Sequence, residues 1–139
     1  MLAMAEPSKP PGWVPVLLWA VWLTLLCVWT VGLLIPEPHQ ALGVGHVDLD
    51  WRFIISKLSH LAVYTILAAF AGLLPVGRRG RVMIVALLLC HGAATEFLQQ
   101  FVPTRTASLL DVGIDAVGTA LGTAAAWAWR MRFSRGSTQ

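Results

Sequence analysis

The stretch that decides the fold runs from His91 to Gly122 and reads HGAATEFLQQFVPTRTASLLDVGIDAVGTALG. It joins two apolar segments through Pro103 and a short polar turn, yet charged and amide side chains also lie within the apolar segments. The polar residues of the stretch include Glu96, Gln99, Gln100, Arg105, Asp111 and Asp115. Charge is costly inside a bilayer and usually functional there, so these residues mark a candidate site if the flanking segments span a membrane.

The composition of the chain predicts an integral membrane protein. Hydrophobic residues make up 57% of the 139 residues, charged residues only 12%, and the mean hydropathy is +0.70. A soluble domain carries roughly 25% charged residues, about twice as many. The chain is basic, with a pI of about 9.4, but no basic stripe interleaved with aromatic residues is present. The basic residues therefore indicate membrane topology, and no nucleic-acid partner is expected.

Four apolar segments are each long enough to cross a hydrocarbon core of ~30 Å. They run over residues 14–36, 53–74, 82–101 and 109–129. We therefore expect an all-α fold, an integral membrane four-helix bundle over residues 13–130. A disordered Pro-rich tail at 1–12 and a basic tail at 131–139 would flank it.

No cofactor or metal is expected from the motifs. The chain has no CxxC, no Gly-rich phosphate loop and no His/Cys cluster at metal spacing. His39 and His46 lie in the polar stretch 36–52, which reads as a loop in which both are solvated. Cys27 and Cys90 lie in the middle of apolar runs and are expected to be small buried side chains.

The distribution of basic residues predicts the orientation. Most of them lie in the first tail, in the connection between the second and third segments, or after the fourth. These are Lys9, Arg78, Arg79, Arg81, Arg130, Arg132 and Arg135. The positive-inside rule places this side, and with it both termini, in the cytoplasm. The acidic loop and the turn that carries Arg105 would then face outward.

Polar residues of three segments fall at similar depths, computed at ~1.5 Å per helical residue. Roughly 5–6 Å from the outer ends of their segments lie Lys57, Gln99 and Asp111. Roughly 10 Å from those ends lie His60, Glu96 and Asp115. Three helices that are separate in sequence therefore deliver polar residues to the same outer third of the membrane.

The acidic stripe of the fourth segment continues into a GxxxG motif. Asp111 and Asp115 are spaced i, i+4, and the same face reaches Gly118 and Gly122. Small residues let a neighbouring helix approach closely, so this face should point into the bundle. We expect the two glycines to serve helix packing alone.

Several of these residues also have a purely structural explanation. Lys57 could extend its amine to the outer interface. His60 and Tyr64, which share a helical face with Lys57, could be core residues with one hydrogen bond each. Asp111 could serve only the N-terminus of its own helix, with Ser108 as N-cap in a capping-box arrangement.

Glu96 is the hardest of these residues to explain structurally, because it is deep and has no capping role. A carboxylate at that depth must take up a proton or pair with a cation. The cations expected at its level are Lys57 and Arg105. His91 lies deeper and points away from Glu96, so we interpret it as a packing or helix–helix hydrogen-bonding residue outside the site.

These positions and their spacing resemble the VanZ-like family. Its pattern is D-K-x-x-H-x-x-x-Y, then E-x-x-Q, a Pro and an Arg, then S-x-x-D-x-x-x-N-x-x-G-x-x-x-G. The matching residues are Lys57, His60, Tyr64, Glu96, Gln99, Pro103, Arg105, Ser108, Asp111, Gly118 and Gly122. Ser56 replaces the family's first Asp and Asp115 replaces its Asn. The resemblance covers about residues 53–125.

The resemblance implies a multi-pass protein of the bacterial plasma membrane with an envelope role and a contribution to glycopeptide (teicoplanin) tolerance. It implies no mechanism, and the residues leave three classes open. Lys57, Arg105 and His60 could bind the phosphate or carboxylate head of an envelope precursor or other membrane lipid. Glu96 or Asp111 with His60 could act as acid and base on a lipid-linked substrate. The charges could also only fix helix register. We favour binding over catalysis; a homo-oligomer stays open.

Overall fold

The computed structural model describes residues 11–36, 49–103 and 105–135. The expected loop histidines His39 and His46 lie outside the described residues. So do most of the expected N-terminal tail and the last residues of the C-terminal tail.

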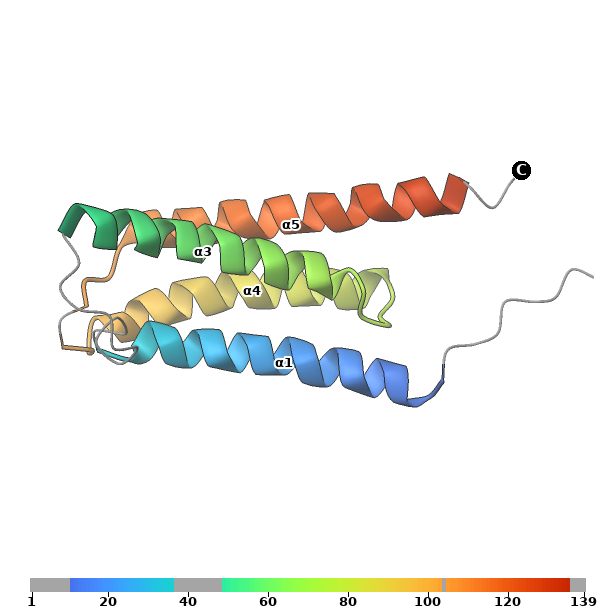
Figure 1. Ribbon diagram of the computed structural model, residues 1–139, viewed down its shortest axis with the longest axis horizontal. Coiled ribbons are helices and arrows are strands. Elements are labelled where there is room, and N and C mark those ends of the chain that lie inside the picture. The colour runs from blue at the N-terminus through green and yellow to red at the C-terminus, as the bar shows by residue number, and fades with distance from the viewer. Residues whose placement is uncertain (1–10, 37–48, 104, 136–139) are drawn as a thin grey trace, which may run out of the picture.

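The described part of the chain is helical, without a strand, as the sequence predicts. Its helices are α1 (Trp13–Leu34), α3 (Leu49–Ala71), α4 (Arg78–Gln99) and α5 (Leu109–Arg135). They run antiparallel to their chain neighbours and form one elongated bundle (Figure 1). Each contains a stretch long and apolar enough to cross a membrane, so the prediction of four candidate spans is confirmed.

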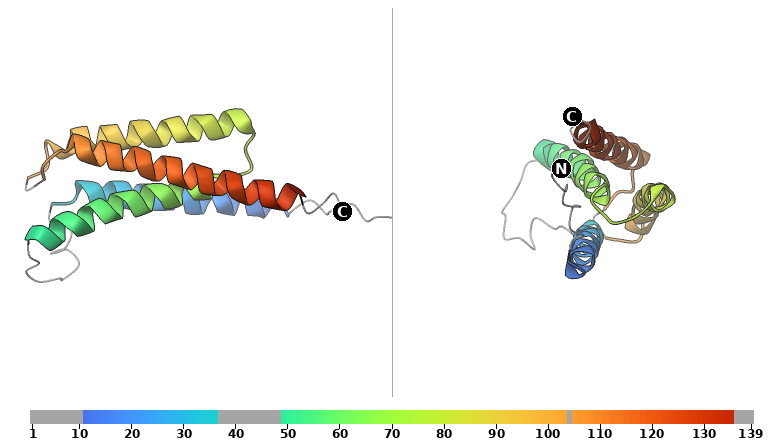
Figure 2. Two further views of the ribbon diagram at one scale, coloured as in Figure 1. Left: turned by 90° about the horizontal axis from the view of Figure 1, so that it is seen from above. Right: turned by 90° about the vertical axis from the view of Figure 1, so that its right-hand side faces the viewer.

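The bundle has two ends that differ in chemistry. We call the end that contains Leu34, Gln99 and Leu109 the polar end, and the end that contains Trp13, Ala71 and Arg78 the groove end. The described chain begins and finishes at the groove end (Figure 2).

The basic residues lie within helices to a greater extent than the sequence suggested. α4 begins at Arg78, so the arginines expected in a turn form its first turn, and α5 continues through Arg130 and Arg132. Gly77 precedes α4 in an extended conformation, and α3 ends at Ala71, four residues before Pro75.

The closest helix pair is α3 and α5, which lie side by side (Figure 2). The GxxxG glycines make this approach possible. A Cβ on Gly118 would lie 2.7 Å from the carbonyl oxygen of Leu61, and a Cβ on Gly122 would overlap that of Thr65. Close backbone contact through small residues is a principal means of helix association in a bilayer, where lipid is as apolar as the side chains.

A buried apolar cluster fills the part of the bundle toward the groove end. It includes Trp22, Leu67, Leu74 and Leu88, and Trp22 Nε1 donates to the carbonyl oxygen of Leu67 at 2.9 Å. This bond holds α1 against α3.

The expectation for the cysteines is wrong, because Cys27 and Cys90 are both exposed on the surface of the bundle. An apolar neighbourhood in the sequence predicts burial only when the solvent is water. The outer surface of a membrane bundle faces lipid and is itself apolar, so that inference does not hold here.

Candidate functional site

Two hydrogen-bonded side-chain pairs join α3 to α5 near the polar end. Lys57 Nζ lies 2.6 Å from Asp111 Oδ1, and His60 Nδ1 lies 2.8 Å from Asp115 Oδ1. The members of each pair were assigned to matching depths from the sequence. Asp111 therefore does more than serve its own helix N-terminus, because its carboxylate accepts a hydrogen bond from a lysine of another helix.

Glu96 brings α4 to the same place, but with a different partner from the one expected. Its Oε2 accepts a hydrogen bond from the backbone N–H of Ser108 at 2.8 Å. The expected cations are bonded elsewhere, Lys57 to Asp111 and Arg105 to carbonyl oxygens of α1. In a capping box, Asp111 would accept a hydrogen bond from the Ser108 N–H. Here Glu96 of the preceding helix accepts that bond instead.

Two carboxylate oxygens in this region are buried without a hydrogen-bond partner among the described residues, Glu96 Oε1 and Asp115 Oδ2. Asp115 fits between the helices because residue 92 is a glycine. A Cβ on Gly92 would lie 2.9 Å from Asp115 Oδ2. Buried polar groups normally have partners, so these two oxygens are the acceptors in the cluster to which a proton, a water molecule or a ligand could bind.

A second hydrogen-bonded chain lies deeper and joins Tyr64, a predicted site residue, to His91, which the sequence analysis placed outside the site. His91 Nδ1 lies 2.8 Å from the hydroxyl of Tyr64, and His91 Nε2 lies 2.8 Å from Thr30 Oγ1. His91 is therefore a helix–helix hydrogen-bonding residue, as interpreted, and it also connects Tyr64 to α1. Thr30 is a polar residue in an otherwise apolar part of α1. That contrast was the sequence signal that could have identified it. Trp29 packs edge-on against His60 at 5.4 Å between ring centroids.

Gln99 and Arg105 hold the C-terminus of α1. Gln99 Nε2 donates to the carbonyl oxygen of Leu33 at 3.1 Å, and Arg105 Nη2 donates to that of Gly32 at 3.0 Å and more weakly to that of Ile35. The last carbonyl groups of a helix lack intrahelical donors, and positive charge is favourable there. Burial lowers the pKa of the Arg105 guanidinium, and nearby Glu96 and Asp111 oppose that shift, so the side chain stays charged.

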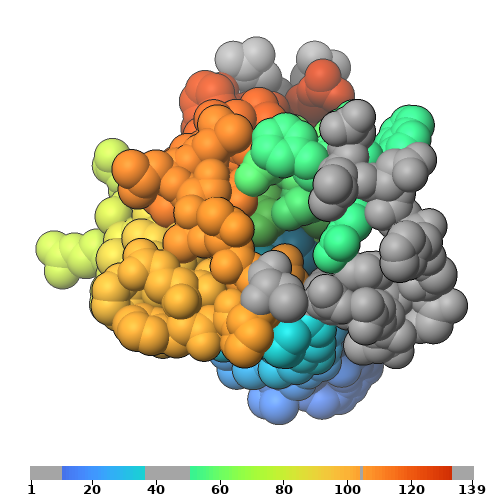
Figure 3. Space-filling model, turned by 90° about the vertical axis from the view of Figure 1, so that its left-hand side faces the viewer, coloured from blue at the N-terminus to red at the C-terminus, as the bar shows by residue number. Residues whose placement is uncertain are grey.

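The polar cluster, defined as Lys57, His60, Glu96, Asp111 and Asp115, is reached from the polar end. Figure 3 views this end, where the segment before α5 lies beside the start of α3 and part of the surface between them is hollowed. Lys57 is the most accessible member, with its side chain 18% exposed, while the other four are buried. Carboxylate and imidazole groups in this arrangement could bind a cation, exchange protons or hold a polar headgroup.

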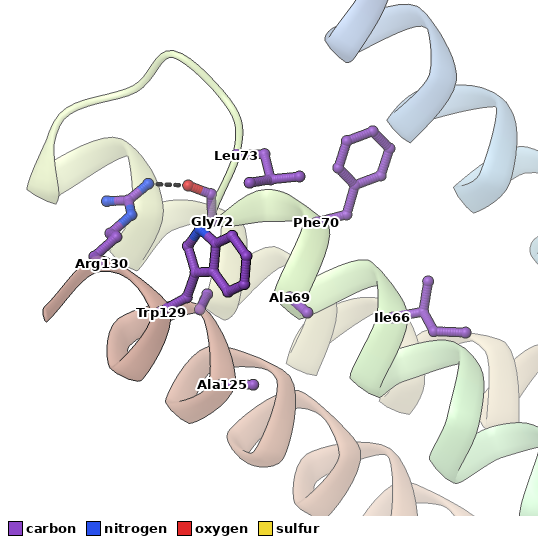
Figure 4. A pocket seen from close by; sticks show the side chains of 9 residues that line it. Ile66, Ala69, Phe70, Gly72, Leu73, Ala125, Trp129 and Arg130 are labelled. Atoms are coloured by element: carbon purple, nitrogen blue, oxygen red, sulfur yellow. Dashed lines mark hydrogen bonds between the residues drawn. The ribbon is translucent and has the colours of Figure 1, made fainter. Parts of the chain in front are cut away.

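A groove of about 860 Å³ lies at the opposite end, between α3 and α5. Its lining is almost wholly apolar, with Ile66, Phe70, Leu73 and Trp129, and Arg130 donates to the carbonyl oxygen of Gly72 at its rim (Figure 4). Its lining contains no acid or base apart from this arginine, so the candidate site is the polar cluster and not this groove.

We found no protein-family model, no curated protein and no solved structure that matches this chain.

Proposed function

We propose that this is a VanZ-like protein of the bacterial plasma membrane with both termini in the cytoplasm and the polar end toward the outer leaflet. Arg78, Arg79 and Arg81 in the first turn of α4 support this orientation. A cation at a helix N-terminus interacts unfavourably with the helix dipole, by about 0.3–1 kcal/mol. The position of these arginines must therefore be favoured by something other than the helix itself. Contact with an anionic cytoplasmic leaflet would favour it. A fusion reporter inserted at residue 44 that is active only in the cytoplasm would overturn the orientation.

The polar cluster, in this proposal, binds the headgroup of an anionic envelope lipid or lipid-linked precursor. The observation that carries the proposal is the position of Lys57. Its amine is the accessible member of an otherwise buried cluster and lies 2.6 Å from Asp111 at the polar end. An accessible ammonium in the outer third of the membrane can share its protons between Asp111 and an incoming phosphate or carboxylate.

The remaining groups suit the rest of such a headgroup. Arg105 lies outside the spans, and the hydrogen bonds described for it use Nε and Nη2, which leaves Nη1 to donate to a ligand. The unpartnered acceptor Asp115 Oδ2 would accept a bond from a hydroxyl or amide group. A headgroup with one acidic group and at least one hydroxyl or amide donor therefore matches the cluster better than a simple phosphate does.

Native mass spectrometry of the chain released from nanodiscs of envelope lipids tests this. We expect one co-purified anionic lipid per chain, reduced about tenfold in Lys57→Gln, a loss of ~1.4 kcal/mol. The control is Arg132→Gln, which removes an exposed positive charge at the groove end. Equal lipid loss in both variants, or no lipid in the wild type, would contradict the proposal.

A second candidate is an acid–base enzyme that acts on a lipid-linked substrate. The observation that favours it is the buried His60–Asp115 pair, because a carboxylate that orients an imidazole is a common arrangement in general-base catalysis. Turnover of the bound lipid that is lost in His60→Gln while lipid binding persists would establish this alternative.

A purely structural role for the charges is the remaining outcome. Glu96→Gln and Arg105→Gln distinguish it in cells. If both variants accumulate normally in the membrane and teicoplanin sensitivity changes, the cluster has a function beyond folding. If both vanish from the membrane, the charges fix helix register.

A further inference from the structure

Three side chains from three helices converge within the polar cluster. His60 of α3, Glu96 of α4 and Asp111 of α5 can each present one ligand atom, and these atoms all lie within 4.8 Å of one another. Two ligands of one ion, at bond lengths of about 2.0–2.2 Å, can be at most about 4.4 Å apart. Small side-chain rotations would bring the three atoms into that range. All three residues are buried.

Glu96 supplies an independent indication of a ligand. The residue is 4% exposed, its Oε2 is bonded to Ser108, and its Oε1 has no partner in the described part of the chain. The backbone bond fixes the carboxylate and leaves one buried oxygen as an acceptor. A metal ion would use the lone pairs of that oxygen without any change of fold.

His60 is arranged as a metal-binding histidine. Its Nδ1 lies 2.8 Å from Asp115 Oδ1, so Nδ1–H donates to the carboxylate and Nε2 keeps the lone pair that a metal needs. Metal-binding histidines nearly always donate their other ring N–H to a carboxylate, carbonyl or water, and this fixes tautomer and orientation. Asp115 would be the positioning residue, seated against Gly92.

The charges of the cluster also favour a cation. Glu96, Asp111 and Asp115 as carboxylates carry three negative charges, and the nearby side chains Lys57 and Arg105 supply two positive ones. Lys57 engages Asp111 Oδ1, which leaves Oδ2 as a ligand atom. A divalent ion would turn the remaining negative charge into a positive one, which suits the binding of an anionic headgroup.

We propose that His60, Glu96 and Asp111 bind one divalent transition-metal ion, Zn²⁺ or Mn²⁺, with Asp115 as the residue that positions His60. A set of one imidazole and two carboxylates is typical of these ions, whereas Mg²⁺ and Ca²⁺ prefer oxygen ligands alone. The remaining coordination positions are open to water or to a ligand oxygen. The site goes beyond the proposed lipid function, because an ion can bind whether or not a lipid does.

The test is metal binding by the full-length chain in nanodiscs of a zwitterionic lipid, without any envelope precursor. After chelation and dialysis, we expect calorimetric titration with Zn²⁺ or Mn²⁺, and elemental analysis, to give one ion per chain. Glu96→Gln should abolish that ion. Asp115→Asn should weaken it about 10–100-fold, the usual effect of changing a residue that orients a ligand.

Folding and adventitious binding are controlled separately. Each variant is checked for helicity and a monodisperse elution profile, and Asp111→Asn replaces Glu96→Gln if the latter does not fold. The double variant His39→Ala/His46→Ala should keep the ion. The proposal is overturned by any of three results. The wild type shows no saturable metal binding, or Glu96→Gln (or its substitute Asp111→Asn) folds and binds the ion with unchanged affinity. The third is loss of the ion only in the His39/His46 variant. Because no precursor lipid is present, the result is independent of lipid binding.

Discussion

The same two helices, α3 and α5, are joined in different ways at the two ends of the bundle. At the polar end they are connected by the Lys57–Asp111 and His60–Asp115 pairs. Toward the groove end Gly72 packs against Ala126, and Arg130 donates to the Gly72 carbonyl oxygen. At the groove end the contact is made by small residues and one arginine, whereas the polar end carries charges that are costly in a bilayer. The ligand proposed for the polar cluster would account for this difference.

The largest effect is expected from breaking the His60–Asp115 pair. Asp115→Ala leaves the His60 Nδ1–H buried without its acceptor, which costs about 1–3 kcal/mol, and the space left by the deleted carboxylate adds to that cost. Equilibrium unfolding in mixed micelles measures this cost.

The double variant His60→Leu/Asp115→Leu separates stability from function at this pair. Apolar replacement of both members is often close to neutral, so we expect the double variant to recover most of the stability while it binds neither metal nor lipid. If the double variant is as unstable as Asp115→Ala, the pair is structural and the contrast between the two ends fails.

A smaller effect is expected from the close helix contact. Gly122→Ala would place a methyl group against the Thr65 carbonyl and 2.8 Å from Ala68 Cβ, which should cost about 1–3 kcal/mol as overpacking. Gly113→Ala on the same helix is the matched control, because a Cβ there meets nothing within 4 Å. It should be neutral or stabilising by at most about 1 kcal/mol. Equal effects of the two changes would mean that α3 and α5 do not pack through Gly122.

Lys57→Met should change the affinities for the metal ion and for the anionic lipid in opposite directions. It removes a positive charge 2.6 Å from Asp111, so metal affinity should rise and anionic lipid affinity should fall, each by about tenfold or ~1.4 kcal/mol. Calorimetry with Zn²⁺ and native mass spectrometry with lipid report the two changes independently. A fall in both affinities would indicate that Lys57 only maintains the shape of the cluster.

The sequence placed the paired residues of α3 and α5 level with one another but did not predict the partner of Glu96. Helix periodicity and rise placed His60 and Asp115 at one level, because both quantities depend only on regular backbone geometry. The partner of Glu96 could not be predicted, since it is a backbone N–H at the start of α5 whose position depends on the turn after Pro103. Burial of Cys27 was mispredicted because hydropathy does not distinguish a lipid-facing surface from a protein core.

The smallest effect is expected from the two arginines that cap helix C-termini at opposite ends. Arg105 donates to carbonyl oxygens at the end of α1, and Arg130 donates to one at the end of α3. Their replacement by glutamine removes a charge from each helix terminus, which is worth about 0.3–1 kcal/mol.

Hydrogen exchange followed by mass spectrometry resolves this small effect, because it should be local. Exchange should accelerate up to about fivefold near residues 31–36 in Arg105→Gln and near residues 70–74 in Arg130→Gln, with the rest of the bundle unchanged. Arg105→Gln should also weaken lipid binding, because Arg105 adjoins the polar cluster, while Arg130→Gln should not. If both variants weaken lipid binding equally, the headgroup is not bound at the polar end and the two ends are not functionally distinct.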